Sequence, residues 1–324
     1  MDVGILGILS ANLPTQNATS SVRNGLMSFQ NYWSYSTQEA FHTCPRRYMI
    51  RKIQAAEGAL PSLSNIKFAF GHAVGAGVAK YDETRSLPDA IFEAFLSWDV
   101  DLLEEDRRSA NSNGRSFAEA VFALMRYATF FEDSPLKDLT HVASETVFGI
   151  DFEDGHFYTG HIDEILRDSV TGKFVIKENK TTGVYNLHPA MYGNSDQALS
   201  YAIALSVAED TSYEVVYTIY DVNKREWIYL PFIKEAYKKA EWLQDQLMLH
   251  AQQDTCVEMG LFPKRGSGCM SYGTACPYYG ACDQFTTEQF HNLVWVDSLK
   301  DLESIEPMTY KVSLSDITKT LKEK

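Results

Sequence analysis

Three charged residues lie on two neighbouring segments in which apolar and polar side chains alternate. Alternation of this kind predicts β-strands, and in the segment FVIKENKTT it sends Glu178 and Lys180 to the same face. Asp163 lies on the preceding predicted strand, and the turn DSVTGK at residues 168–173 favours pairing of the two strands. If the register sets Asp163 opposite Glu178, two carboxylates converge with an ammonium group beside them.

Converging carboxylates suit a hard divalent cation such as Mg²⁺ or Mn²⁺, which prefers oxygen ligands. Such a cation polarises a phosphoryl oxygen and lowers the pKa of a bound water. Lys180 would then orient the water or offset negative charge that develops on the phosphate. Phosphodiester hydrolysis is the natural reaction for this set of groups. The alternative is a solvated ion pair at a strand edge, worth at most about 1 kcal/mol.

The elements around these strands predict an α/β sandwich in which helices flank a mixed central sheet. Period-two patterning predicts strands at residues 143–152, 156–167, 173–181, 213–221 and 226–232. Helical periodicity predicts helices at about 68–81, 87–105, 115–132, 194–208 and 233–256. Gly71, Gly75 and Gly77 in the first of these indicate a helix that packs closely against another backbone.

The domain organisation expected from the sequence is a single large domain with appended segments. Residues 1–30 are polar and lack periodicity, so they are predicted to form a flexible arm. Residues 31–290 form the predicted domain, with a helical insertion at about 85–135 and a cysteine-rich segment at about 260–285. Residues 291–324 are left as a C-terminal tail.

The composition of the 324 residues, 45% hydrophobic and 13% aromatic, is sufficient for a substantial core. The formal net charge of -14 argues against coating nucleic acid through overall charge, because such binding neutralises phosphates with Lys and Arg. A local basic group can still contact phosphates, and the densest one comprises Arg46, Arg47, Arg51 and Lys52. The short apolar N-terminus lacks a leading basic residue, which predicts no signal peptide and a cytoplasmic location, the host cytoplasm if the chain is phage-encoded.

The hairpin region GHIDEILRDSVTGKFVIKENKTTG resembles the RecB-like branch of the PD-(D/E)XK nucleases. The matching residues of that motif are Gly160, Asp163, Glu178, Lys180 and Thr181. Downstream, Gln197 and Tyr201 stand four apart on a predicted helix and match the Gln-x-x-x-Tyr motif of the same branch. The resemblance implies a restriction-endonuclease-like core, with Asp163 and Glu178 as metal ligands and Lys180 as a catalytic residue. It also implies that Gln197 and Tyr201 contact DNA or support the site.

Two further metal ligands are weaker expectations. Glu145 lies on the first predicted strand, where the family often carries another acidic residue near the site, and a solvent-facing glutamate on a half-buried strand is the alternative. The family also tends to have a histidine four residues after a glycine in an early helix. Counting from Gly71, this chain has Gly75 at that place, and the nearby histidine is His72, about one helical turn away. His72 could still reach the site, but a packed or exposed helical histidine is the more common interpretation.

Four cysteines suggest a second inorganic centre. Cys269, Cys276 and Cys282 lie in a loop rich in Gly, Pro and Tyr, and Cys44 is the best candidate for a fourth ligand. One cysteine before the core and three after it resemble the iron-sulfur nucleases of the AddB type and of CRISPR adaptation, which implies a structural 4Fe-4S cluster. Zinc bound by four thiolates and free buried thiols remain alternatives. Cys256 is expected to be a small core residue.

These observations predict a metal-dependent deoxyribonuclease, expected to be an exonuclease acting on DNA ends or single strands in recombination, repair or phage DNA processing. Because the sequence has no phosphate loop of the Walker type, unwinding would require a helicase or recombination partner. Oligomeric state stays open. The alternatives are a nuclease-derived DNA-binding or assembly protein without catalysis and a zinc-organised interaction module.

Overall fold

The computed structural model describes residues 31–56, 66–98, 114–183, 187–193, 195–208, 211–271, 274–293, 297–305 and 307–323. The predicted arm at 1–30 and residues 99–105 of the predicted helix at 87–105 lie outside these residues, so these parts of the prediction stay untested. The chain divides into two compact units. Unit 1 takes Met1–Leu60, Asp151–Tyr158 and Glu235–Ile305, and unit 2 takes Pro61–Ile150, Thr159–Lys234 and Glu306–Lys324.

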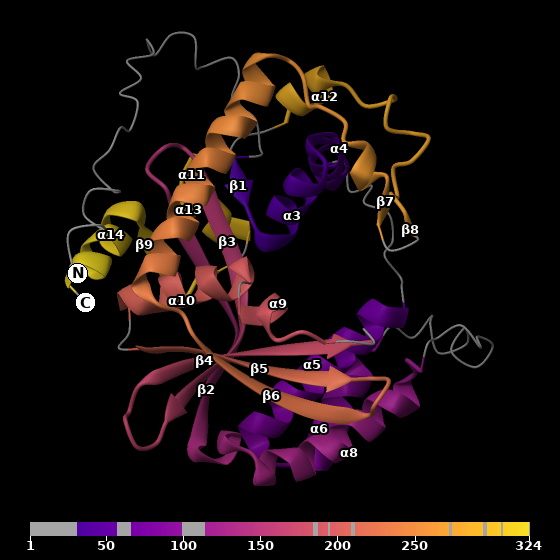
Figure 1. Ribbon diagram of the computed structural model, residues 1–324, viewed down its shortest axis with the longest axis vertical. Coiled ribbons are helices and arrows are strands. Elements are labelled where there is room, and N and C mark those ends of the chain that lie inside the picture. The colour runs from indigo at the N-terminus through magenta and orange to yellow at the C-terminus, as the bar shows by residue number, and fades with distance from the viewer. Residues whose placement is uncertain are drawn as a thin grey trace. The chain divides into compact units, whose positions relative to one another are not determined.

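The main sheet has the strand order β6-β5-β4-β3-β2-β9 (Figure 1). Its strands are β2 (Leu139–Asp151), β3 (Phe157–Asp168), β4 (Phe174–Thr182), β5 (Thr211–Asp221), β6 (Glu226–Ile233) and β9 (Tyr310–Ser313). β4 pairs antiparallel with β3 and parallel with β5, while β5 and β6 pair antiparallel. The mixed central sheet expected from the sequence is therefore confirmed.

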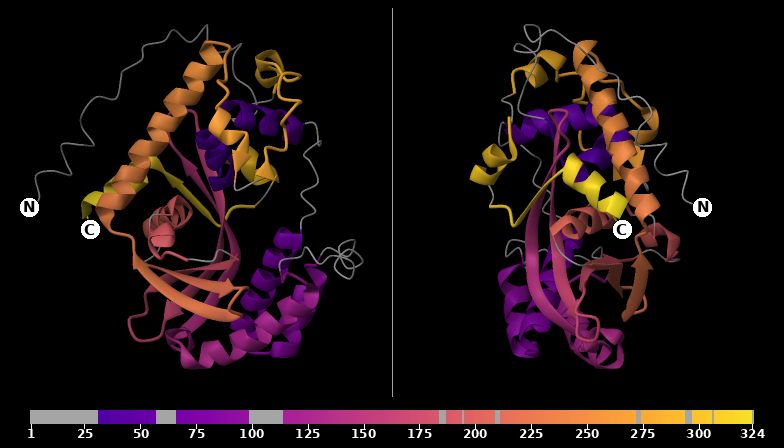
Figure 2. Two further views of the ribbon diagram at one scale, coloured as in Figure 1. Left: turned by 45° about the vertical axis from the view of Figure 1, so that its right-hand side comes forward. Right: turned by 90° about the vertical axis from the view of Figure 1, so that its left-hand side faces the viewer.

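Helices cover both faces of the sheet in unit 2. On one face lie α5 (Ile66–Thr84), α6 (Leu87–Leu96) and α8 (Phe117–Asp133), drawn in indigo to purple in Figures 1 and 2. They bury a core with the strand residues Leu166, Val175 and Val216. On the other face, α10 (Asp196–Ala208) contacts β4 and β5. The short helices η1 (Pro135–Asp138) and α9 (Ala190–Gly193) connect these elements.

Close packing of α5 against its neighbours depends on a glycine. A Cβ atom at Gly77 would lie 2.6 Å from Leu124 Cδ1 on α8 and 3.0 Å from the backbone oxygen of Ala90 on α6. A larger residue would force the Leu124 side chain to move and would crowd the backbone of α6. The expectation that this glycine-rich helix packs closely against another backbone is confirmed.

Unit 1 contains helices from both ends of the chain and three strands of two residues each. Its elements are β1 (Tyr32–Trp33), α3 (Tyr35–Thr43), α4 (Pro45–Ala56), α11 (Ala236–Glu258), η2 (Gly266–Gly268), β7 (Met270–Ser271), β8 (Thr274–Ala275), α12 (Thr287–His291) and α13 (Leu299–Ile305). β1 pairs in parallel with the start of β3. Trp33 and Tyr48 stack at 4.9 Å in the core of this unit, with Phe41 against the edge of both.

The structure differs from the expected elements mainly near the ends. The helix predicted at 87–105 stops at Leu96, where Ser97 forms its C-cap. Residues 307–323, left as an uninterpreted tail, supply β9 and α14 (Leu314–Glu323), and both contact α10. Among the described helices, none is both long enough and apolar enough to cross a membrane.

Candidate active site

The register of the β3 and β4 pair brings two carboxyl groups to one face of the sheet. Glu164 pairs with Lys177, and the same register continued by one residue sets Asp163 opposite Glu178. The backbone N–H of Asn179 donates to Asp163 Oδ2 at 3.0 Å, which holds that carboxylate beside the strand. Side chains directly opposite each other in an antiparallel pair point the same way, so these two acids face each other across the two strands.

The carboxyl of Glu178 is fully buried, and one of its two oxygens has a polar partner among the described residues. Lys180 Nζ forms an ion pair with Oε1, whereas Oε2 is buried without a hydrogen-bond partner among the described residues. Burial raises the pKa of Glu178 to about 8, and the neighbouring Asp163 adds to that effect although Lys180 opposes it. Burial also raises the pKa of Asp163. Negative charge at this pair is therefore undercompensated, which is the condition that a bound cation relieves.

Lys180 is held by a hydrogen-bonded chain that ends on α10. Its ammonium donates to Gln197 Oε1 at 3.0 Å, and Gln197 Nε2 donates to the hydroxyl of Tyr201 at 2.6 Å. The two α10 residues meet because positions four apart on a helix share one face. Tyr201 is buried with its ring against the edge of Phe148, at a centroid distance of 5.7 Å.

Gly160 is explained by the packing beneath this chain. A Cβ atom at that position would lie 2.8 Å from Phe148 Cε1 and 3.5 Å from Tyr201 Cε1. Glycine lets the rings of Phe148 and Tyr201 approach β3 directly. The glycine of the Gly-x-x-Asp motif thus positions the aromatic support of the site and carries no chemistry of its own.

Glu145 and two histidines lie in the electrostatic surroundings of these acids. Glu145 has φ +48°, a left-handed conformation that is uncommon outside glycine and unexpected within a strand. Desolvation and the charge of Asp163 raise the pKa of Glu145, while His161 and His72 oppose that rise. His161 Nδ1 lies 3.9 Å from Glu145 Oε2. His161 was not singled out from the sequence, although alternation puts it on the same face as Asp163.

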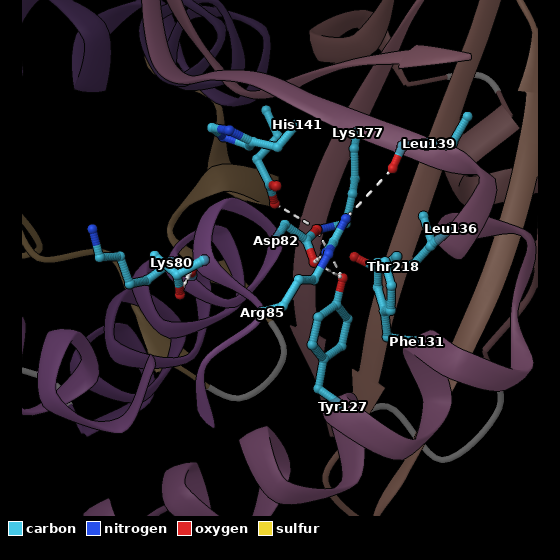
Figure 3. Close-up of polar contacts among 12 residues, drawn as sticks. Lys80, Asp82, Arg85, Tyr127, Phe131, Leu136, Leu139, His141, Lys177 and Thr218 are labelled. Atoms are coloured by element: carbon cyan, nitrogen blue, oxygen red, sulfur yellow. Dashed lines mark hydrogen bonds and ion pairs between the residues drawn. The ribbon is translucent and has the colours of Figure 1, made fainter. Parts of the chain in front are cut away.

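A buried ionic network occupies the opposite face of the same two strands (Figure 3). Lys177 Nζ donates to Glu164 Oε1 at 2.5 Å and to Asp82 Oδ2 on α5 at 2.6 Å. The hydroxyl of Tyr127 on α8 donates to Asp82 at 3.0 Å. Burial lowers the pKa of Lys177, but the two carboxylates outweigh it and raise that pKa above its ordinary value.

Asn179 joins this network to the candidate site. Its side-chain Nδ2 donates to Glu164 Oε1 at 2.6 Å, and its Oδ1 accepts from the Thr218 hydroxyl at 2.5 Å. Its backbone N–H is the group bonded to Asp163. One residue therefore fixes carboxylates on both faces of the sheet, and nothing in the local sequence pattern distinguishes it.

The basic residues predicted to contact phosphates do not all lie on a surface. Lys52 is 2% exposed, and its ammonium donates to the backbone oxygen of Tyr32 at 2.9 Å and lies 4.0 Å from the centre of that ring. The prediction that Lys52 belongs to a phosphate-binding strip is corrected, because its ammonium is occupied inside unit 1. Arg46, Arg47 and Arg51 are partly exposed.

The cysteines lie in unit 1, and the structure explains one of their spacings. Met270 pairs with Ala275 in the hairpin β7-β8, and the backbone N–H of Cys276 donates to the Cys269 oxygen at 2.8 Å. The six intervening residues thus bring Cys269 and Cys276 to the open end of a hairpin. A Cβ atom at Gly268 would lie 3.1 Å from Cys44 Cβ, so Cys44 lies against the same loop.

The sulfurs are not gathered around one small ion. Tetrahedral zinc with thiolates at about 2.3 Å requires sulfurs about 3.8 Å apart. Among the described residues, the group of His, Cys, Asp and Glu donors that lies within 4.8 Å of one another contains no cysteine. The arrangement places Cys44, Cys269 and Cys276 in one region without a closed zinc site, and Cys282 is a partly exposed free thiol.

A family model matches most of this chain, and solved structures resemble its fold. The family model described as the PD-(D/E)XK nuclease superfamily matches residues 32–283. Among solved structures, the chain is similar to a candidate exonuclease from Eubacterium rectale, with 14% identity, a TM-score of 0.47, and 90% of this chain and 98% of that chain covered. It is also similar to SSO0001, with 12% identity, a TM-score of 0.27, and coverage of 62% and 84%. None of the curated proteins matches the chain.

Proposed function

This chain belongs to the PD-(D/E)XK nuclease superfamily, and we propose that it is a divalent-metal-dependent deoxyribonuclease acting as an exonuclease on DNA ends or single strands. Membership confirms the family expected from the hairpin motif. The observation that carries the proposal is Glu178, whose buried Oε2 has no partner in the described part of the chain while Asp163 stands opposite it. The RecB-like and AddB-type resemblances remain predictions.

The donor set fits Mg²⁺ or Mn²⁺. Asp163 and Glu178 supply hard oxygen ligands. Glu145 and His72 are proposed as further ligands, because the charge of Glu145 helps to raise the pKa of Glu178 and His72 opposes the raised pKa of Glu145. When bound, the cation would polarise the scissile phosphate and make a water a better nucleophile. Binding would also balance the negative charge that burial now disfavours at the two carboxyl groups.

Lys180 is the proposed catalytic lysine. Its ammonium stands beside Glu178, where it can orient the attacking water or offset charge developing on the phosphate. Gln197 keeps the ammonium in place through its amide oxygen, and Tyr201 accepts from the amide nitrogen. The hydroxyl of Tyr201 therefore fixes which end of the amide faces the lysine, because a flipped amide would present a donor to a donor.

Phosphate contacts outside the site are proposed for Arg46, Arg47 and Arg51, whose charge is local in a chain that is acidic overall. Unwinding is assigned to a partner helicase. We propose that residues 31–290 act as one nuclease domain, with its active-site residues drawn from unit 2.

A structural 4Fe-4S cluster bound by Cys44, Cys269, Cys276 and Cys282 is the second part of the proposal. Its support is the hairpin that aligns Cys269 with Cys276 and the contact of Cys44 with Gly268. Among the described residues no three of these sulfurs lie within 4.8 Å of one another, so they do not form a closed zinc site. Brown colour and visible absorption after anaerobic purification are expected, and a colourless protein loaded with zinc would contradict the cluster.

The nuclease proposal is tested with end-labelled linear, end-blocked linear, circular and single-stranded DNA, each with Mg²⁺, Mn²⁺ or chelator. Metal-dependent loss of label from free ends is expected, with closed circles resistant. Lys180→Ala should abolish the activity, whereas Lys173→Ala, which removes an exposed lysine at the start of β4, should not. Unchanged cutting by Lys180→Ala would reject the site.

A second candidate function is DNA binding or assembly without catalysis. The observation that favours it is Gly75, a glycine at the position where the family tends to carry a metal-binding histidine. The same assay decides between the two. Metal-independent DNA binding with no cutting of any substrate would establish the binding protein.

A further inference from the structure

A cluster of histidines and aspartates lies in unit 1, outside the proposed catalytic residues. Asp154 and His156 belong to the turn between β2 and β3, and His250 belongs to α11. One donor atom from each of these three residues lies within 4.8 Å of the other two. No local motif marks this group, because the two histidines are 94 positions apart in the chain.

The turn is built so that its side chains converge. Gly155 has φ +92°, and the backbone N–H of His156 donates to Asp154 Oδ1 at 2.9 Å. Asn31 stabilises the turn with two hydrogen bonds. Its side-chain Nδ2 donates to the Gly155 oxygen at 2.5 Å, and its backbone oxygen accepts from the Phe157 N–H at 2.8 Å. Asp154 and His156 are thereby held toward α11.

The imidazoles are buried but poorly satisfied. His156 and His250 are 4% and 1% exposed. Nε2 of His250 has no hydrogen-bond partner among the residues that the structure describes, and the two ring nitrogens of His156 make no well-aligned hydrogen bond there, although each lies 3.4 Å from a carboxylate oxygen. Leaving a buried polar group without a good partner costs about 1–3 kcal/mol, and a ligand bound at His156 Nδ1 would relieve part of that cost.

One donor separation matches that around a transition metal ion, because His156 Nδ1 lies 3.4 Å from Asp154 Oδ1. His250 Nδ1 and Asp154 Oδ2 share a hydrogen bond at 2.8 Å, which a bound ion would replace. With metal-ligand bonds of about 2.0–2.2 Å, tetrahedral geometry separates neighbouring donors by about 3.4 Å. The two rings stack at 4.3 Å and 12°, so one must turn about its Cβ–Cγ bond for both to bind one ion, and that torsion is soft.

Neighbouring residues supply the support that metal-binding histidines usually have. Asp254, one helical turn after His250, has Oδ1 3.4 Å from His156 Nε2. A carboxylate there fixes the tautomer that leaves Nδ1 free to bind. Trp33 stacks on His250 at 5.9 Å, and the edge of Phe152 meets the same ring at 4.7 Å, which limits its movement.

We propose that Asp154, His156 and His250 form a binding site for Zn²⁺ or a similar transition metal ion, with Asp254 as a positioning residue that orients His156. Two imidazoles and one carboxylate are ligands that zinc accepts readily, whereas Mg²⁺ prefers oxygen alone. Asp154 is partly exposed, which leaves a fourth position open to water. The ion would fasten the β2-β3 turn to α11 within unit 1.

The test is a titration of the chelator-treated full chain with Co²⁺, followed by displacement with Zn²⁺. For this site, visible ligand-field bands without a thiolate charge-transfer band are expected, since its ligands are nitrogen and oxygen. Asp154→Asn and His250→Gln should each weaken binding at least about 100-fold, and Asp254→Asn by about 10–100-fold. His188→Ala, which removes an exposed histidine in unit 2, should change nothing.

The proposed catalytic carboxylates are also oxygen ligands, so the titration is repeated with Glu178→Gln. Bands that persist in Glu178→Gln and disappear in Asp154→Asn support the new site, whatever becomes of the nuclease proposal. Bands that survive Asp154→Asn, or vanish in Glu178→Gln, overturn it. Anomalous scattering from zinc-soaked crystals of the unaltered chain needs no variant, and the absence of a peak beside His156 and His250 would equally overturn it.

Discussion

Gln197 lies between Lys180 and Tyr201, accepting a hydrogen bond from the lysine at 3.0 Å and donating one to the tyrosine at 2.6 Å. The amide of Gln197 therefore connects the ammonium of Lys180 on β4 to the hydroxyl of Tyr201 on α10 through two hydrogen bonds. Its orientation, and with it the position of the ammonium, depends on a hydroxyl that has no role of its own in the proposed chemistry.

Tyr201→Phe should lower kcat while leaving the fold intact. The ring keeps its edge contact with Phe148, but the amide of Gln197 loses the acceptor that orients it. Hydrogen bonds to charged groups contribute about 1.5–3 kcal/mol, so Gln197→Leu should lower kcat about 10- to 100-fold and Tyr201→Phe by less. Steady-state kinetics with thermal denaturation of each variant checks this, and equal kcat in all three proteins would contradict it.

Two glycines on α5 form a matched pair for a test of packing. Gly77→Ala should destabilise the chain by about 1–3 kcal/mol, because its Cβ would meet Leu124 and the backbone of Ala90. Gly75→Ala should be neutral or stabilising by up to about 1 kcal/mol, since its Cβ meets nothing within 4 Å and alanine favours the helix. Urea denaturation of both variants measures the difference, and equal midpoints would refute the close packing.

Alternation predicted correctly which side chains share a face of β3 and β4, because successive side chains on a strand point to opposite faces of the sheet. Glu178 and Lys180 share a face, and β3 and β4 lie within about two residues of their expected bounds. Gln197 and Tyr201 meet for the same kind of reason, since helical spacing is also local. Each of these relationships depends only on residues that are close together in the sequence.

Long-range contacts were beyond such reasoning. Lys177 pairs with Asp82, 95 residues earlier in the chain. The alternation of apolar and polar residues does not predict that a charged residue on a strand is buried. Lys52 looked like part of a basic surface, yet its aliphatic stem and ammonium fit under Tyr32. Local patterns give the direction of a side chain, whereas its partner depends on how distant segments pack.

Lys177→Met should be among the most destabilising substitutions in unit 2. It removes the ammonium that compensates Asp82 and Glu164, both of which are buried. Breaking a buried ion pair from one side costs about 3–5 kcal/mol, whereas replacing all charges together costs less. The triple change Lys177→Met, Asp82→Asn and Glu164→Gln should therefore be more stable than Lys177→Met alone.

Chemical denaturation of these proteins measures the effect, with Lys173→Met as the control for loss of an exposed lysine. A triple variant less stable than Lys177→Met would show that the carboxylates contribute through contacts other than this lysine.

The buried Lys52 predicts that stability rises with pH, which is opposite to the pH dependence that a salt-bridged lysine would cause. Burial, with a smaller contribution from Arg51, lowers the pKa of Lys52 from 10.5 to about 7. Between those two values the unfolded chain holds the proton and the folded chain does not, so stability rises with pH, by at most about 1.4 kcal/mol per pH unit. Below pH 7 both states are protonated, and the full penalty of burying the charge is present.

Lys52→Met removes this proton and should flatten the corresponding part of the stability curve. The free energy of unfolding of the unaltered chain minus that of Lys52→Met should increase from pH 7 to pH 9, since only the unaltered chain gains from losing the proton. Lys137→Met, at an exposed lysine of η1, should run parallel to the unaltered chain. Parallel curves for Lys52→Met as well would mean that Lys52 keeps its charge in the folded protein, stabilised by the Tyr32 oxygen and ring.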